Sequence, residues 1–88
     1  MAFKILIAED EEITVKHLVN TLKKEGYAVD SAATGIDALR KAESDSFDLL
    51  IADIKMPGMT GIELLERVRD KLPELEVIIV TGYGSIGS

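Results

Sequence analysis

Three carboxylate residues stand directly after apolar runs of the sequence, where their side chains could meet. Glu9 and Asp10 follow the run at residues 3–8, and Asp53 follows the run at residues 47–52. Ligands of open parallel sheets bind just beyond the carboxyl ends of the strands, so these acids are candidate site residues. From the residues alone, Glu9 and Asp10 could instead cap a helix, and Asp53 could belong to a turn.

If these carboxylates meet, each raises the pKa of the others unless a cation joins them. The chain has no cysteine and one histidine, so a metal in this site would be held by oxygen. Hard oxygen ligands favour Mg²⁺ or a similar ion. A carboxylate beside Mg²⁺ can attack a phosphoryl donor and become an acyl phosphate, because the metal screens the incoming charge. Asp53 is the predicted nucleophile.

The elements that must position these acids alternate along the chain. Strands are expected at residues 3–8, 27–32, 47–52 and 77–80, with a helix over residues 11–25 and two more helices that begin at Thr34 and Thr60. The third strand is a continuous apolar run, which is typical of a strand covered on both faces. Two capping boxes, Thr34 with Asp37 and Thr60 with Glu63, predict the second and third helix starts.

This alternation predicts a doubly wound α/β fold, a parallel sheet built from right-handed crossovers. The acidic turns after the first and third strands place those two strands side by side, which gives the strand order 2-1-3-4. The first helix then lies on one face of the sheet and the other two on the opposite face. One helix alone is left to cover its face.

Composition limits the partners of the protein. Acidic residues outnumber basic ones 16 to 10, the net charge is −6, and no basic run interrupts the acidic balance, which argues against a nucleic-acid surface. The first residues carry too short an apolar run for a signal peptide or a membrane span. We therefore expect a single domain over residues 1–88 that is cytoplasmic and freely diffusing.

Three motifs together resemble a known family. With the Glu9–Asp10 pair, the run DIKMPGMTG at residues 53–61 and the run VTGYG at residues 80–84, the chain resembles the CheY-like receiver domain of two-component response regulators. The resemblance implies a flavodoxin-like fold and transfer of a phosphoryl group from a partner histidine kinase to Asp53. It also implies that Glu9, Asp10, Asp53 and the main-chain carbonyl of Lys55 hold Mg²⁺.

The resemblance assigns roles to residues around the phosphoryl group as well. Thr81 matches the hydroxyl that contacts the phosphoryl group and switches the domain between two states. Lys55, Gly82 and Tyr83 match positions that border that group. From the residues alone, Thr81 leaves the strand next to Asp53 and could also be a turn or cap residue.

The chain stops before the family's pattern ends. A full receiver continues with a fourth helix, a fifth strand and a fifth helix, about 30 to 40 residues at usual element lengths. The resemblance thus predicts a truncated domain that lacks the family's lysine and is impaired in phosphorylation. It also predicts an exposed apolar edge at residues 77–80 and an uncovered sheet face, through which chains form a homodimer or a higher oligomer.

Two other classes of function are compatible with parts of the sequence. In the first, the acidic pocket is vestigial and the chain is a non-phosphorylatable fragment that serves binding or assembly. The second is an enzyme, but phosphatases of the haloacid dehalogenase type need an aspartate two residues after the first, where this chain has Lys55. A flavodoxin would cradle a phosphate in its first loop, which the acids of residues 9–12 would repel. We therefore expect no enzyme activity.

Overall fold

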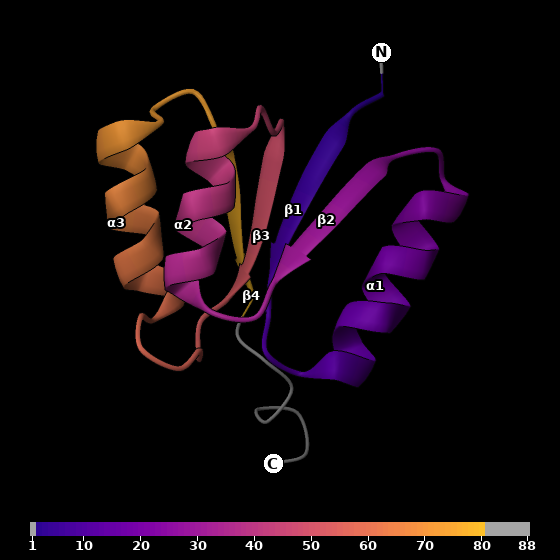
Figure 1. The fold of residues 1–88 in the computed structure, drawn as a ribbon, viewed down its shortest axis with the longest axis horizontal. Coiled ribbons are helices and arrows are strands. Elements are labelled where there is room, and N and C mark those ends of the chain that lie inside the picture. Colours follow the sequence, from indigo (N-terminus) through magenta and orange to yellow (C-terminus); the bar gives the residue numbers. More distant parts are fainter. Residues whose placement is uncertain (1, 81–88) are drawn as a thin grey trace.

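Strands and helices alternate strictly along the chain in the computed structural model, which describes residues 2–80 (Figure 1). The strands are β1 (Lys4–Ala8), β2 (Ala28–Ala32), β3 (Leu49–Asp53) and β4 (Glu76–Val80). The helices are α1 (Glu12–Lys24), α2 (Gly35–Ser44) and α3 (Gly61–Lys71). The third strand departs most from its expected range, because it begins later and includes Asp53.

All four strands are parallel, and their order is β2-β1-β3-β4. This confirms the doubly wound, flavodoxin-like arrangement predicted from the two acidic turns. Ala8 is the register partner of Ala52, so β1 and β3 end side by side. The crossover direction reverses between these two strands, which makes their carboxyl ends the switch point where ligands of such sheets bind.

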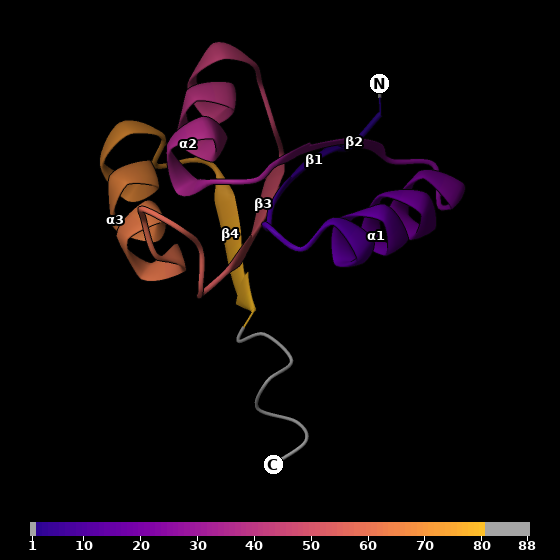
Figure 2. The same cartoon turned by 60° about the horizontal axis from the view of Figure 1, so that its bottom comes forward.

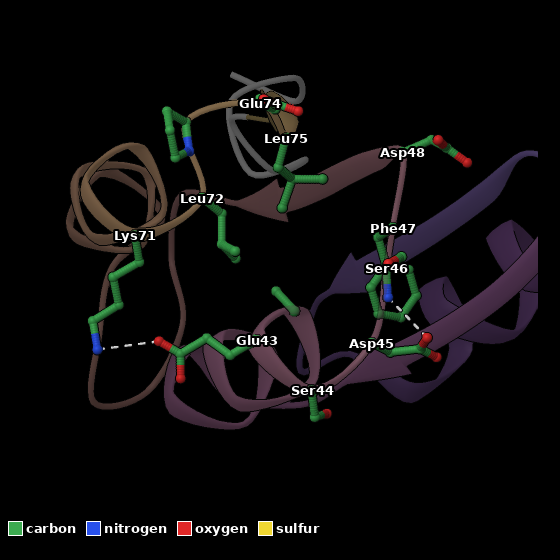
Figure 3. A pocket seen from close by; sticks show the side chains of 12 residues that line it. Glu43, Ser44, Asp45, Ser46, Phe47, Asp48, Lys71, Leu72, Glu74 and Leu75 are labelled. Carbon is green, nitrogen blue, oxygen red and sulfur yellow. Dashed lines mark hydrogen bonds and ion pairs between the residues drawn. The ribbon is translucent and has the colours of Figure 1, made fainter.

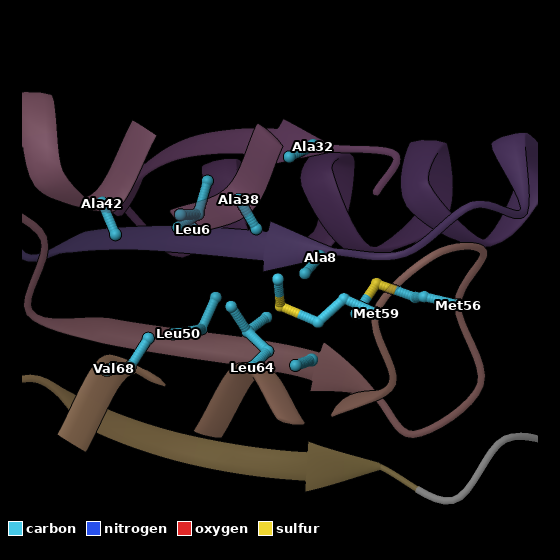
Figure 4. Close-up of a cluster of buried hydrophobic side chains, with 11 residues drawn as sticks. Leu6, Ala8, Ala32, Ala38, Ala42, Leu50, Met56, Met59, Leu64 and Val68 are labelled. Atoms are coloured by element: carbon cyan, nitrogen blue, oxygen red, sulfur yellow. The ribbon is translucent and has the colours of Figure 1, made fainter. Parts of the chain in front are cut away.

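The helices divide between the two faces of the sheet as predicted, with α2 and α3 on one face and α1 on the other (Figure 2). Side chains alternate along a strand, so Leu6 and Leu50 point to the α2 and α3 face. There they join Leu64 and Val68 in the main core, where all four are fully buried (Figure 4). Helices α2 and α3 therefore bury the central apolar side chains of this face.

Helix α1 covers its face of the sheet only on the side of β2 and β1. Exposure rises along one register-matched row of residues, from Ile7 at 1% through the half-buried Ile51 to Ile78 at 51%. Helix α1 packs chiefly on β2, and none of its residues is fully buried. The expectation that the third strand is covered on both faces is therefore wrong for this face, since one helix cannot span four strands.

The two predicted capping boxes differ in the structure. Thr60 accepts the N–H of Glu63 at 3.1 Å, and the Glu63 carboxylate accepts the N–H of Thr60 at 3.0 Å, so this box is confirmed. Thr34 accepts the N–H of Asp37 at 3.1 Å without a return bond. Aspartate is one methylene shorter than glutamate, and Asp37 instead pairs with Arg40 at 3.8 Å. The box predicted at Thr34 is thus a simple cap.

The reciprocal cap gives a stability prediction. Replacing Thr60 with alanine removes the acceptor for the N–H of Glu63 and is expected to lower the free energy of unfolding by about 1 kcal/mol. Thr60→Ser keeps the hydroxyl and serves as the control. Urea denaturation followed by circular dichroism measures both variants, and equal losses in the two would contradict the capping role.

Candidate functional site

The three acids predicted to meet do come together at the carboxyl ends of β1 and β3. One carboxylate oxygen each of Glu9, Asp10 and Asp53 lies within 4.8 Å of the other two. Glu9 and Asp53 are nearly buried, at 6% and 5% exposure, whereas Asp10 is exposed to solvent. We call these three residues the acidic cluster. Its geometry agrees with the spatial prediction made from the two strand ends.

Backbone hydrogen bonds hold the two buried acids of the cluster. The Glu9 carboxylate accepts the N–H of Glu11 at 3.0 Å, and the N–H of Glu9 donates to the carbonyl of Ala32 at 3.0 Å. Glu11 is itself the N-cap of α1 and makes no side-chain cap. The Glu9 carboxylate thus bonds to the backbone of the N-cap residue of α1.

The segment after Asp53 is fixed on both sides. Oδ1 of Asp53 accepts the N–H of Lys55 at 3.2 Å, so the backbone of Lys55 lies next to the acidic cluster. Met56 and Met59, each 8% exposed, anchor the rest of the segment in the core (Figure 4). Lys55 itself is exposed and lines a shallow hollow of about 400 Å³ together with Asp10 and Thr60. A group bound at the cluster would have open access from this side.

Gly61 allows α3 to pack closely beside Asp53, although the sequence indicated only a turn at this position. A Cβ atom on Gly61 would lie 2.6 Å from the carbonyl oxygen of Asp53 and 2.9 Å from Cα of Ile54. The N–H of Gly61 donates to the carbonyl of Ile54 at 3.0 Å. The start of α3 therefore packs directly on the end of β3, and only glycine leaves room for this approach. Its place one residue after the helix cap indicates a helix start but does not by itself predict this close contact.

The remaining predicted site residues, Thr81, Gly82 and Tyr83, lie outside the described residues. The last described residue of β4, Val80, is the register partner of Asp53. Its carbonyl accepts the N–H of Ile54 at 2.9 Å. The roles expected for residues 81–83 stay predictions.

A separate hollow lies at the other end of the strands, away from the acidic cluster (Figure 3). It measures about 630 Å³ and is lined by the α2–β3 and α3–β4 connections, with an ion pair between Lys71 and Glu43 at 3.1 Å. A hydrogen bond from the Lys4 ammonium, with one from the N–H of Ser46, lowers the pKa of Asp45 on its rim. None of the acidic cluster lines this hollow, so it is separate from the candidate site.

The fold and the acidic cluster define a doubly wound α/β protein with three carboxylates together at its switch point. Comparison with known protein families identifies the family within this fold class. The model of the response regulator receiver domain matches residues 5–87, and the chain belongs to this family. The family match thus confirms the resemblance to receiver domains that was based on the motifs at Glu9–Asp10 and after Asp53.

Individual relatives agree with the family match. The response regulator receiver protein CpdR of Brucella abortus is 37% identical over 83 residues, which cover 94% of this chain and 69% of CpdR. The first curated relatives are longer proteins, of which the chain spans between 18% and 69%.

Solved structures match the fold closely. One is response regulator protein TrrA of Thermotoga maritima in complex with Mg²⁺ and BeF, with a TM-score of 0.89 and 38% identity, over 97% of this chain and 73% of that one. Another is a complex of histidine kinase ThkA with TrrA, with a TM-score of 0.88 and 38% identity, over 100% of this chain and 75% of that one. Among residues 2–80, no helix is long and apolar enough to span a membrane.

The acidic cluster gives a cation-binding prediction. Mg²⁺ titration is expected to shift the amide resonances of Asp10 and Asp53 in a saturable way, because three carboxylate oxygens within 4.8 Å suit a hard divalent ion. Asp10→Asn removes one charged ligand from an exposed position and is expected to weaken binding about tenfold or more. Glu12→Gln removes the same charge outside the cluster and should bind almost as wild type does. Equal weakening in both variants would mean that Mg²⁺ affinity depends on the overall negative charge and not on coordination by Asp10.

Proposed function

We propose that this receiver domain takes a phosphoryl group from a partner histidine kinase onto Asp53. The observation that carries the proposal is the convergence of Glu9, Asp10 and Asp53 within 4.8 Å at the switch point of the sheet. The complex between ThkA and TrrA supports a kinase as the partner. Asp53 is nearly buried, and the hollow beside Asp10 and Lys55 gives a donor access to the cluster.

The proposed reaction is a direct displacement at phosphorus. Oδ1 of Asp53 accepts the N–H of Lys55, so we assign the attack to Oδ2. Oδ2 forms the new oxygen–phosphorus bond while the phosphorus–nitrogen bond to the kinase imidazole breaks. The imidazole nitrogen keeps the electron pair of that bond, and the product is an acyl phosphate on Asp53. The backbone bond to Lys55 keeps the carboxylate in place during the attack.

The donor set fits Mg²⁺, which the complex of TrrA with Mg²⁺ and BeF also supports. Glu9, Asp10, Asp53 and the carbonyl of Lys55 would hold the ion. When bound, it supplies positive charge that screens the carboxylates from the incoming phosphoryl group. The three carboxylates and one Mg²⁺ still carry a net charge of about −1, so we propose that phosphorylation of this chain is slow.

Further assignments belong to the same proposal. Thr81 is the switch hydroxyl, and Gly82 and Tyr83 border the phosphoryl group together with Lys55. The domain is not an enzyme that turns over external substrates, because Lys55 stands where a phosphatase of the haloacid dehalogenase type needs a second acid. A cytoplasmic location, with no direct nucleic-acid or membrane partner, completes the proposal.

Phosphorylation is tested with acetyl phosphate and Mg²⁺ as the donor mixture. Wild-type chain is expected to gain the mass of one phosphoryl group slowly, and Asp53→Asn is expected to gain none because the amide is not nucleophilic. Asp48→Asn changes an exposed acid before β3 and should behave as wild type does. Intact-mass spectrometry measures the fraction modified. Equal incorporation in wild type and Asp53→Asn would move the acceptor elsewhere.

A second function, self-association, is favoured by the surface of β4. Ile78 and Val80 are 51% and 44% exposed on the face that α1 leaves open. Among the described residues β4 has a neighbour on one side only, so its other edge presents unpaired backbone groups. We propose that chains associate through this edge or this face, as a homodimer or a higher oligomer. In the alternative that the acidic cluster is vestigial, this would be the chain's main role.

Sedimentation velocity tests the association. The chain is expected to sediment as a dimer or larger species at micromolar concentration, and Ile78→Lys is expected to shift it to monomer because a buried lysine would lose its hydration. Ile36→Lys is the matched control, since Ile36 is 52% exposed on α2. A wild-type chain that stays monomeric throughout the micromolar range would reject self-association.

A further inference from the structure

The start of α2 lies directly against the segment that follows Asp53. Gly35 is the first residue of α2, and it is buried. A Cβ atom on Gly35 would lie 2.7 Å from Cβ of Met59 and 3.1 Å from the carbonyl oxygen of Met59. Atoms of close-packed side chains do not approach each other so closely. Glycine is therefore the residue that lets the backbone of α2 reach Met59.

Met59 belongs to a hydrogen-bonded loop that also contains Lys55. The N–H of Gly61 donates to the carbonyl of Ile54 at 3.0 Å, and this bond closes the residues between them into a loop. Within the loop, the N–H of Lys55 donates to Oδ1 of Asp53 at 3.2 Å. Because both ends of the loop are fixed, a displacement of Met59 is taken up by the residues inside it, and Lys55 is one of them.

The connection between β2 and α2 contacts the chain on both sides of the acidic cluster. The carbonyl of Ala32, at the end of β2, accepts the N–H of Glu9 at 3.0 Å. Three residues later, Gly35 packs on Met59. The connection thus contacts the chain that leaves β1 and the chain that leaves β3, although it contributes no carboxylate to the cluster. Its position affects how those two segments lie relative to each other.

We propose that Gly35 is a positioning residue for the acidic cluster, acting through Met59 on Lys55. Because α2 rests on Met59, the loop stays in the position from which the Lys55 carbonyl and the Asp53 carboxylate would hold the ion. The inference rests on the Mg²⁺ site proposed above and adds a residue that touches neither the ion nor the phosphoryl group. Replacing residues that orient metal ligands from outside typically lowers metal affinity by about 10- to 100-fold.

The variant Gly35→Ala tests this role, because alanine is the better helix former and a loss must come from the lack of space. In the metal-free chain, Gly35→Ala is expected to shift the amide resonance of Lys55. It should also lower the protection of this amide from hydrogen exchange more than that of the amides in β1. In a Mg²⁺ titration, the affinity of the acidic cluster is expected to fall about tenfold or more.

The variant Thr34→Ala is the matched control at the same end of α2. It removes the side chain that accepts the N–H of Asp37, so it destabilises the helix, but it adds no atom beside Met59. Its Lys55 amide and its Mg²⁺ affinity should therefore stay close to those of the wild-type chain. A purely structural role of Gly35 would make the two variants alike once their stabilities, measured by urea denaturation, are compared. That result would overturn the inference.

A double-mutant cycle tests whether the effect passes through Met59. Met59→Gly removes the Cβ atom that a side chain at position 35 would meet, so adding Gly35→Ala should cause little further loss of Mg²⁺ affinity. This pair also decides the question if Gly35→Ala alone does not fold. A large further loss would overturn the inference, because the effect would not depend on Met59.

The metal-free measurement separates this inference from the proposed metal site. An unchanged Lys55 amide in Gly35→Ala would overturn the positioning role, even where the wild-type chain binds Mg²⁺ as proposed. A wild-type chain that binds no Mg²⁺ would instead reject the metal site. In that case a selective change at the Lys55 amide would still support the action of Gly35 on the loop, and its absence would overturn it.

Discussion

The parallel pairing of β1 with β3 is the constraint on which the rest of this molecule depends. Neither strand carries a complete site, since β1 leads to Glu9 and Asp10 and β3 ends at Asp53. Their register, with Ala8 beside Ala52, brings the acids of both strands to one point. The strands that fix this register are also the most buried ones, so the stability of the core and the geometry of the acidic cluster have the same origin.

Much of this arrangement could be predicted because it depends on local signals. The apolar runs ended at acids, and the order of the strands followed from those acids, while the handedness of crossovers assigned the helices to the two faces. The Thr60 cap was correct because glutamate is long enough to reach back, whereas the same pattern at Thr34 failed because Asp37 is too short. Such a difference of one methylene is chemical and could have been foreseen.

Other features depend on contacts between distant segments and were not predictable. The apolar run of β3 indicated two covered faces, but coverage depends on where α1 lies, and α1 packs chiefly on β2. The approach of Gly61 to the carbonyl of Asp53 depends on how the start of α3 meets the end of β3. A single glycine in a turn-rich segment does not distinguish a tight contact from a flexible turn.

The shallow burial of α1 has a consequence for the energetics of the site. Helices with little buried surface tend to open locally before the rest of a domain does, and α1, unlike α2 and α3, has no buried residue, so we expect it to open first. The connection between β1 and α1 contains Glu9 and Asp10, and Glu9 bonds to the residue that starts the helix. An ion that immobilises these acids would therefore also order α1. By thermodynamic linkage, a partner that binds α1 and holds it against the sheet would raise the affinity of the acidic cluster for that ion.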